Sequence, residues 1–341
     1  MNKYFELNRQ RLSLKIILFC IPLAAFLFSF TVGRYGIELP QLISTFYLHY
    51  FGSSLEDSTL DTVVFNIRLP RIIAGMLIGG ALSCAGAAYQ GMFKNPLVSP
   101  DILGASAGAC FGACLAIYFS YSVYMIQLWA FCFGLLAVLL ACFINNHLDY
   151  DPTLGLVLGG ILISTLFSSG TAAIKTIADG NDKLPEITFW LMGSLSSVNQ
   201  RDVLSIIIPM LIGFAALVMV RWRLNVLAFG EDEARTLGVN TRRLRILVIM
   251  GATLITAASV SICGMVGWIG LVVPHLARAI VGPNYRILLP VSFILGASYL
   301  LLVDDLARSL GSVEVPLGIL TALLGVPFFI IIFKYNVRGW K

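Results

Sequence analysis

The sequence is a series of long apolar segments separated by short polar ones. A bilayer core about 30 Å thick needs roughly 20 apolar residues per helix. Ten predicted spans follow, at residues 13–33, 62–92, 102–119, 123–146, 153–177, 202–221, 244–265, 268–281, 287–305 and 315–333. The second exceeds one crossing and is expected to project from the membrane, whereas the eighth is short and contains Pro274. The pattern predicts an all-α, polytopic membrane protein.

The composition supports lipid as the main solvent. Hydrophobic residues make up 58% of the chain and charged residues 12%, with a mean hydropathy of +0.88. A soluble globular domain has about 45–50% apolar and about 25% charged residues. No polar stretch is long enough to bury a core of its own, so residues 1–341 are expected to form a single transmembrane domain. Nucleic-acid binding, disorder and a secreted disulfide scaffold are excluded.

The lysines and arginines orient the chain. Ten spans place both termini on one side, and most of the 23 Lys and Arg residues fall on that side. The exceptions are Arg34, Arg68, Arg71, Lys175, Lys183, Arg201 and Arg308. Because positive charge accumulates in cytoplasmic loops, both termini are expected in the cytoplasm, and the chain in the cell inner (plasma) membrane.

The middles of the predicted spans are almost free of ionisable groups. Asp101, Lys175, Asp304, Asp305 and Arg308 all fall at predicted span ends. An ion-coupled carrier needs such groups near the midplane, which counts against a secondary carrier. A phosphate-binding loop, G-x-x-x-x-G-K-[ST], is also missing from the sequence, so no catalytic residue is expected and any pumping energy must come from a partner. An ion-coupled carrier and a membrane scaffold or sensor without transport remain alternatives.

Small residues recur at helical spacing inside the apolar segments. Gly75 and Gly79 are four apart, as are Gly104 and Gly108, which predicts close helix packing. The cysteines lie inside apolar runs and are expected to be small buried hydrophobes. Cys110 shares a helix face with a second cysteine, but no His or Asp completes a metal site. No metal is therefore expected.

Two polar segments deserve separate interpretation. Residues 229–239 read F-G-E-D-E-A-R-T-L-G-V, with Gly230 as a possible start and Gly238 as a stop. A short helix outside the membrane that another protein grips is one interpretation, and a solvated loop is the other. In the second segment, Asn95-Pro96 and Ser99-Pro100 break the helix at the membrane edge. Irregular backbone there is tolerated only when it is buried or lines a cavity.

Four motifs occur together in one order. They are Arg68-Leu-Pro-Arg71, Asn95-Pro96-Leu97 with Pro100 and Gly104, Gly264-x-x-Gly267-x-x-Gly270-Leu-Val-Val-Pro274-His275-x-x-Arg278, and Glu314-Val-Pro316-x-Gly318. Together they resemble the FecCD-type membrane permeases of binding-protein-dependent ABC importers for iron-siderophores, haem and cobalamin. The resemblance covers about residues 10–335 with matching spacing.

The resemblance implies the permease fold of a type II ABC importer, with about ten helices. Such a subunit pairs with a second permease copy, identical or a related paralogue, around a central pathway. Two cytoplasmic ABC ATPase subunits hydrolyse ATP, and an extracytoplasmic substrate-binding protein delivers the cargo. The implied cargo is an iron(III)-siderophore or related metal chelate, with haem and cobalamin as alternatives. No cofactor is expected on this chain itself.

The resemblance also assigns roles to particular residues. The coupling loop, about residues 222–243, is implied to dock into the ATPase through Glu233, Ala234, Arg235 and Gly238. Docking of the binding protein is implied for Arg68, Arg71 and Arg308, for which headgroup snorkelling is the alternative. The implied gate and pathway residues are Asn95, Pro96, Leu97, Thr153, Trp190, Gly193 and Ser194. His275, beside Pro274 at a predicted break, is interpreted as structural rather than as a haem ligand.

Overall fold

The computed structural model describes residues 2–33, 35–52, 58–147, 152–311 and 313–336, and every regular element in these ranges is a helix. The first half contains α1 (Asn2–Thr31), α2 (Leu39–Phe51), α3 (Ser58–Asp61), the π-helix η1 (Thr62–Arg68), α4 (Leu69–Met92), the 3₁₀-helix η2 (Pro100–Leu103), α5 (Ala105–Tyr118) and α6 (Val123–His147). The second half contains α7 (Pro152–Ile177), α8 (Lys183–Met192), α9 (Gln200–Leu227), α10 (Glu231–Thr236), α11 (Thr241–Cys263), α12 (Ile269–Val281), α13 (Tyr285–Ser309) and α14 (Leu317–Asn336).

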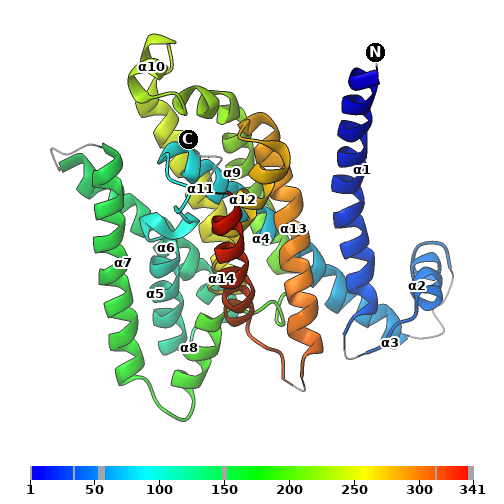
Figure 1. Cartoon of the computed structure of the whole chain (residues 1–341). Helices are drawn as coiled ribbons and strands as arrows, with labels where there is room; N and C mark the ends of the chain where they lie inside the picture. The colour runs from blue at the N-terminus through cyan, green and yellow to red at the C-terminus, as the bar shows by residue number, and fades with distance from the viewer. Residues whose placement is uncertain (1, 34, 53–57, 148–151, 312, 337–341) are drawn as a thin grey trace.

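The apolar helices correspond one for one to the predicted spans. Six helices in the described ranges are long and apolar enough to cross a membrane, and four shorter apolar helices accompany them. Figure 1 shows α10 at one end of the bundle and α8 at the other, hereafter the α10 side and the α8 side. The first helix begins, and the last ends, on the α10 side. The start of α1 and the end of α14 thus lie on one side, as the span count predicts, and the cytoplasmic location of that side stays a prediction.

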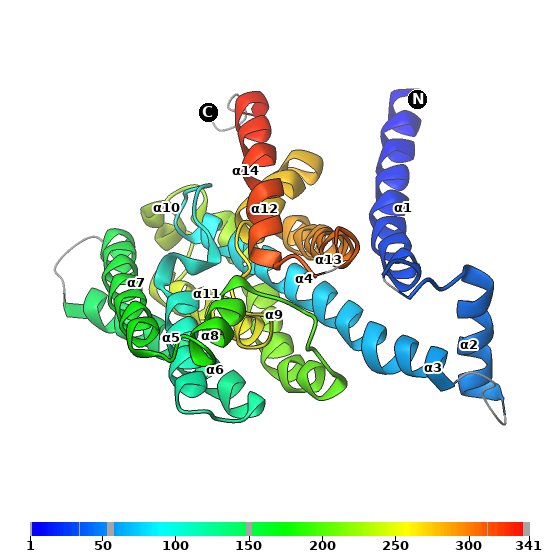
Figure 2. The same cartoon turned by 90° about the horizontal axis from the view of Figure 1, so that it is seen from below.

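The second span is the longest helix. From Thr59 to Met92 the chain forms 34 continuous helical residues, too many for one perpendicular crossing at about 1.5 Å per residue. Figure 2 shows its first part extending away from the bundle and carrying α2 and α3 with it. The length of this span is as predicted, its projection from the membrane stays a prediction, and the π-helical turn of η1 had no signal in the sequence.

Helices α4 and α11 form the centre of the core and are largely buried. Glycines allow their neighbours to approach closely, as the four-residue spacing predicts. A side-chain carbon at Gly79 of α4 would lie 2.2 Å from the carbonyl oxygen of Gly296 on α13. One at Gly108 of α5 would lie 2.3 Å from the carbonyl oxygen of Phe133 on α6. Even an alanine would force these helices apart.

Three expectations about local structure are wrong. The predicted coupling loop begins too early, because α9 continues to Leu227 and residues 222–227 are helical. Pro274 lies inside α12 rather than at a break. Proline removes the N–H that would bond the carbonyl of Gly270, and that carbonyl instead lies against α4 at Gly86. Cys20 and Cys132 are exposed rather than buried, because the outer faces of their helices are apolar too.

Candidate functional site

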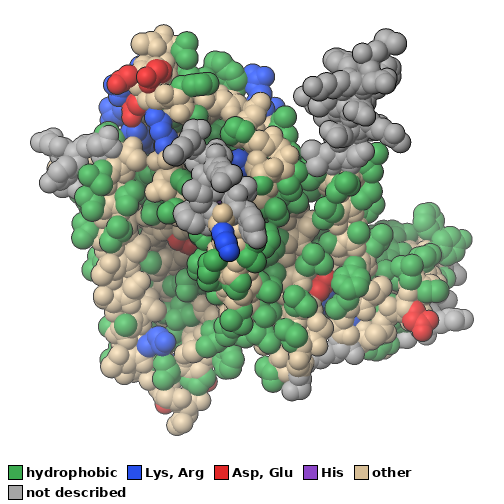
Figure 3. Space-filling view, in the orientation of Figure 1, with side chains coloured by type: hydrophobic (Ala, Val, Ile, Leu, Met, Phe, Trp, Pro, Cys, Tyr) green, Lys and Arg blue, Asp and Glu red, His purple; other side chains and the backbone are tan. Residues whose placement is uncertain are grey.

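Helix α10 is the short helix predicted between α9 and α11, and its coupling role stays a prediction. It begins after Gly230, whose φ is 145°, and ends at Thr236, two residues before Gly238, whose φ of 79° suits only glycine well. Ala234 is fully buried, so it anchors the helix to this chain instead of presenting its methyl group to a partner. The side chains of Glu233 and Arg235 are exposed, as the docking role requires. Figure 3 shows charged side chains gathered over this end of the bundle.

Glu231 is the polar attachment of α10. One carboxylate oxygen accepts hydrogen bonds from the Arg235 guanidinium at 3.1 Å and the Thr241 hydroxyl at 3.0 Å. The other accepts from Nη2 of Arg245 on α11 at 3.2 Å. Partial burial opposes ionisation, but the Thr241 hydrogen bond and the charges of Arg245 and Arg235 outweigh it and lower the pKa of Glu231. The carboxylate is therefore held ionised.

Thr153, one of the predicted gate residues, lies beside this network, and its gate role stays a prediction. It lies in the first turn of α7, and its hydroxyl is 3.5 Å from Nη2 of Arg245, the same nitrogen that binds Glu231. A cavity of about 390 Å³ lies beside these residues, between α10 and the ends of α6 and α7. Its lining includes Asn145 and Leu156 on the far side from Glu231. Sequence reasoning missed the roles of Glu231 and Arg245, although Glu231 and Arg235 have the i, i+4 spacing of a helical ion pair.

The gate loop connects α4 to η2 on the α10 side. The side-chain oxygen of Asn95 accepts from the backbone N–H of Leu97 at 2.9 Å, which fixes the turn. The side chain of Leu97 is 52% exposed. Nε2 of His275 donates to the Pro96 carbonyl at 2.9 Å, so α12 holds the loop directly. This contact gives His275 a structural partner, in line with the structural interpretation.

Gln90 is a second clamp on the gate loop that sequence reasoning missed. Its amide nitrogen donates to the carbonyls of Val98, at 3.4 Å, and Leu271, at 3.3 Å. Its amide oxygen accepts from the Arg278 guanidinium at 3.2 Å. Gln90 is almost fully buried at the end of α4. Because these bonds join α4 to α12 at two points and to the loop at one, α4, the loop and α12 are connected as one unit.

The pathway residues near α8 lie at a junction of three helices. Gly193 ends α8 with a φ of 77°, and its carbonyl accepts from the backbone N–H of Leu317 on α14 at 2.9 Å. The N–H of Ser194 donates to the carbonyl of Cys263 at 2.8 Å. The Trp190 carbonyl lies so close to the turn after α11 that a side chain there would collide with it. This junction ties α8 to the ends of α11 and α14.

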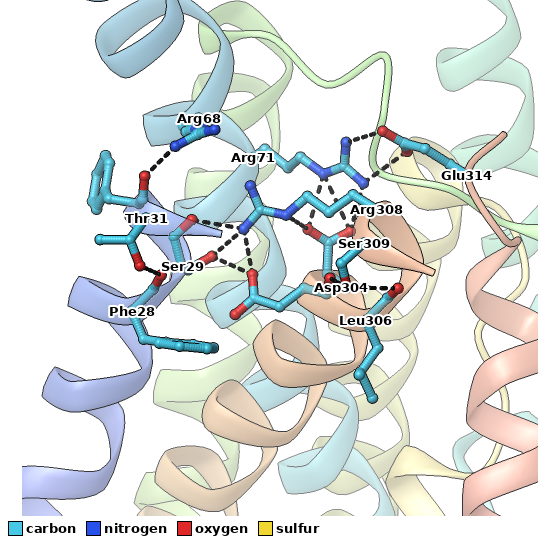
Figure 4. A network of polar contacts seen from close by, with 12 residues as sticks. Phe28, Ser29, Thr31, Arg68, Arg71, Asp304, Leu306, Arg308, Ser309 and Glu314 are labelled. Carbon is cyan, nitrogen blue, oxygen red and sulfur yellow. Dashed lines mark hydrogen bonds and ion pairs between the residues drawn. The ribbon is translucent and has the colours of Figure 1, made fainter. Parts of the chain in front are cut away.

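The three predicted docking arginines lie together, but they are buried. Arg68, Arg71 and Arg308 are 4%, 6% and 6% exposed. Figure 4 shows Arg71 between Asp304 and Glu314, and its guanidinium binds the two carboxylates at 2.8 and 2.9 Å.

The other two arginines complete this buried network. Arg308 donates to Asp305 and to Ser29 of α1, and Arg68 donates to the carbonyls of Phe30 and Tyr35. All three buried guanidinium groups thus have hydrogen-bond partners in the same chain, carboxylates for Arg71 and Arg308 and backbone carbonyls for Arg68. Their docking role remains a prediction.

Comparison with known proteins defines the class of protein. The model of the FecCD transport family matches residues 20–334. The chain therefore belongs to the FecCD family of ABC importer permeases. It is 39% identical over 313 residues to the molybdate import system permease protein MolB of Haemophilus influenzae, which covers 91% of this chain and 92% of that protein. It is 37% identical over 324 residues to a probable iron chelatin transport system permease protein of Helicobacter pylori, covering 95% and 98%.

A solved structure agrees with the fold. An inward-facing conformation of a putative metal-chelate type ABC transporter superposes with a TM-score of 0.84 at 36% identity, covering 94% of this chain and 98% of that one. Other relatives, at 39% and 37% identity, are named as permeases for cobalamin in Halobacterium salinarum and for hemin in Yersinia pestis. The relatives thus share one fold and differ in cargo.

Proposed function

We propose that this permease moves an iron(III)-siderophore or related metal chelate into the cell, driven by two ABC ATPase subunits. The observation that carries the proposal is α10, a short helix fixed to its own chain by Ala234 and Glu231 and exposed elsewhere. The exposed residues Glu233 and Arg235 give it a charged surface suited to a protein partner. ATP hydrolysis belongs to the partners, and this chain is the translocation subunit.

The distribution of charge supports this energy source. From residue 153 to residue 173, most of α7, the sequence has no ionisable side chain that could couple transport to an ion gradient. The sequence also has no phosphate-binding loop of its own. An ion-coupled carrier is the alternative from a different class, and it predicts transport by the chain alone.

The orientation of the chain in the membrane follows from the assignment of α10 as the helix that contacts the ATPases. The α10 side faces the cytoplasm, with both termini, because ATPases lie there and most lysines and arginines do too. The substrate-binding protein approaches the α8 side, near the buried arginines Arg68, Arg71 and Arg308. A second permease copy, identical or a paralogue, completes the pathway, with the gate loop at Asn95–Leu97 on its cytoplasmic end.

The exposed face of α7 supports a bulky cargo. Leu154, Leu158, Ile161, Leu162 and Leu166 are all at least 38% exposed, with small and hydroxyl residues between and beyond them. From residue 153 to residue 173 the sequence has no charged residue. A chelate that covers its metal suits such a wall better than a bare dianion, which needs cationic or hydrogen-bonding partners. Haem and cobalamin fit the same wall.

Molybdate is a second candidate because the relative from Haemophilus influenzae, at 39% identity, is named for molybdate import. The test is reconstitution of the permease with its partner ATPases and binding protein in proteoliposomes. ATP-driven uptake of a ferric chelate, compared with haem, cobalamin and molybdate, identifies the cargo. Uphill uptake by the isolated chain, lost on adding a protonophore and indifferent to ATP, would contradict the proposal.

A further inference from the structure

The coupling helix is attached to its own chain by apolar packing at Ala234 and by polar contacts, most of them at Glu231 and one from Arg235 to Thr241 at 3.4 Å. Ala234 contributes a fully buried methyl group that packs against the neighbouring helices. Glu231 contributes a carboxylate whose side chain is 26% exposed and which binds three partners. The residues between and after them are exposed. A displacement of α10 therefore reaches the rest of the chain through its packing at Ala234 and its hydrogen bonds at Glu231.

The hydrogen bonds at Glu231 lead from α10 to two other helices. Arg245 of α11 binds Glu231 at 3.2 Å, and its side chain is only 13% exposed. The same guanidinium nitrogen lies 3.5 Å from the hydroxyl of Thr153. A single nitrogen atom is thus placed between the coupling helix and the first turn of α7.

The cavity of about 390 Å³ beside this contact explains why the polar link matters. Its walls include Asn145, at the end of α6, and Leu156, on α7. Among the described residues, the cavity separates α10 from the ends of these two helices. A gap of about 0.5–1 Å already forfeits about a quarter to a half of the dispersion attraction between two surfaces, whereas the Arg245 side chain reaches both Glu231 and Thr153.

We propose that Glu231 and Arg245 transmit displacement of the coupling helix to Thr153 and so to the start of α7. This inference rests on the proposed function, in which the ATPases move α10. A charge-assisted hydrogen bond is short, directional and about twice as strong as a neutral one, which suits it to pull as well as push. Both residues are positioning residues, since they act through α7 and not on the cargo.

The test uses the complete complex in proteoliposomes, with uptake and ATP hydrolysis measured in the same sample. The variants are Arg245→Met, which keeps the length of the side chain and removes its charge, and Glu231→Gln. Each is expected to lower uptake per ATP hydrolysed about tenfold, the scale of a typical coupling free energy between sites. Hydrolysis and copurification of the ATPases are expected to stay at the wild-type level. Arg243→Met is the matched control, because Arg243 is an exposed arginine on the same turn of α11.

Two further variants separate transmission from folding. The double variant Glu231→Gln with Arg245→Met is expected to be no worse than either single one, because all of them break the same contact. Thr153→Val keeps the shape of the side chain and removes the hydroxyl, so it tests the far end of the link with little risk to folding. A smaller loss of uptake per ATP is expected from it.

Unchanged uptake per ATP in both single variants would overturn the link. So would loss of the ATPases on purification, which would assign the contact to assembly, or additive losses in the double variant. Failure of the proposed function is distinguishable, because the wild-type complex would then show no ATP-driven uptake at all.

Discussion

On the α8 side, Arg71 and Arg308 lie with Asp304 and Asp305 in a network that solvent scarcely reaches. On the α10 side, the ion pairs centre on one carboxylate, Glu231, and its side chain is 26% exposed. The first network joins α1, α4, α13 and the segment before α14. The second joins a six-residue helix to α11 and α7.

The two networks differ in how readily the helices that they join can move apart. Buried ion pairs have given up their hydration, so losing one partner strands the other charge at a high cost. The α8-side network therefore opposes separation of its helices. A partly hydrated pair can break and re-form with little change in free energy. The α10-side contacts thus suit a region that moves in each transport cycle, whereas the α8-side contacts suit a fixed frame.

Removing one member of the buried network is the strongest test of this comparison. Arg71→Met removes the cation that binds the partly exposed Glu314 and the buried Asp304, and Asp304 keeps the longer contact of 3.6 Å to Nε of Arg308. Breaking a buried pair typically costs about 3–5 kcal/mol, so we expect a large drop in the thermal unfolding midpoint in detergent. Lys183→Met is the matched control, because its pair with Glu186 is longer, at 3.5 Å, and Glu186 is 48% exposed. Equal midpoints for the two variants would break the comparison.

Charge reversal on the exposed face of α10 tests whether the α10 side moves in the transport cycle. Glu233→Arg places a cation on the exposed surface of the coupling helix without touching Glu231. We expect uptake per ATP to fall about tenfold or more, an effect of at least about 1.4 kcal/mol on coupling, while the fold is kept. The measurement is uptake with hydrolysis in proteoliposomes, and the unfolding midpoint is the control. Wild-type uptake would remove Glu233 from the coupling surface.

Removing one charge should cost less free energy of unfolding on the α10 side than on the α8 side. Glu231→Gln removes the charge that holds Arg245 and Arg235, but the site is partly hydrated, so we expect a loss of about 1 kcal/mol or less. The midpoint of thermal unfolding in detergent, compared with that of Arg71→Met, measures the ratio. A loss at Glu231 as large as that at Arg71 would mean that α10 belongs to the fixed frame.

Much of this arrangement is visible in the sequence because it follows local rules. The apolar runs mark all ten predicted spans, and Gly230 and Gly238 bracket α10 to within a residue. Arg71 is conspicuous as a charge at a span end, but its acidic partner Asp304 is 233 residues away. No periodicity links such distant positions, so the sequence gives no sign that the fold buries this arginine beside a carboxylate.

The same limit explains the errors in the gate region. The proline at position 274 predicts a break, yet the chain tolerates it because the freed carbonyl of Gly270 faces the glycine surface of α4. The clamp made by Gln90 depends on Arg278, 188 residues later. Local propensity cannot reveal contacts that only the packed helices create.

Lowering the pH is expected to have the smallest effect, because it removes only the charge of Glu231. The pKa of Glu231 is lowered in the folded chain despite partial burial, by the hydrogen bond from Thr241 and the charges of Arg245 and Arg235. Its contribution to stability is therefore complete above the ordinary glutamate pKa of about 4.3 and is lost as the pH falls through the lowered value. Hydrogen exchange of the α10 amides, compared between wild type and Glu231→Gln, should show extra protection in wild type at pH 6. That difference should shrink as the pH falls through the lowered pKa of Glu231, because the protonated carboxyl then carries no more charge than the amide of the variant. A difference that does not shrink across this titration would show that the charge of Glu231 does not hold α10 in place.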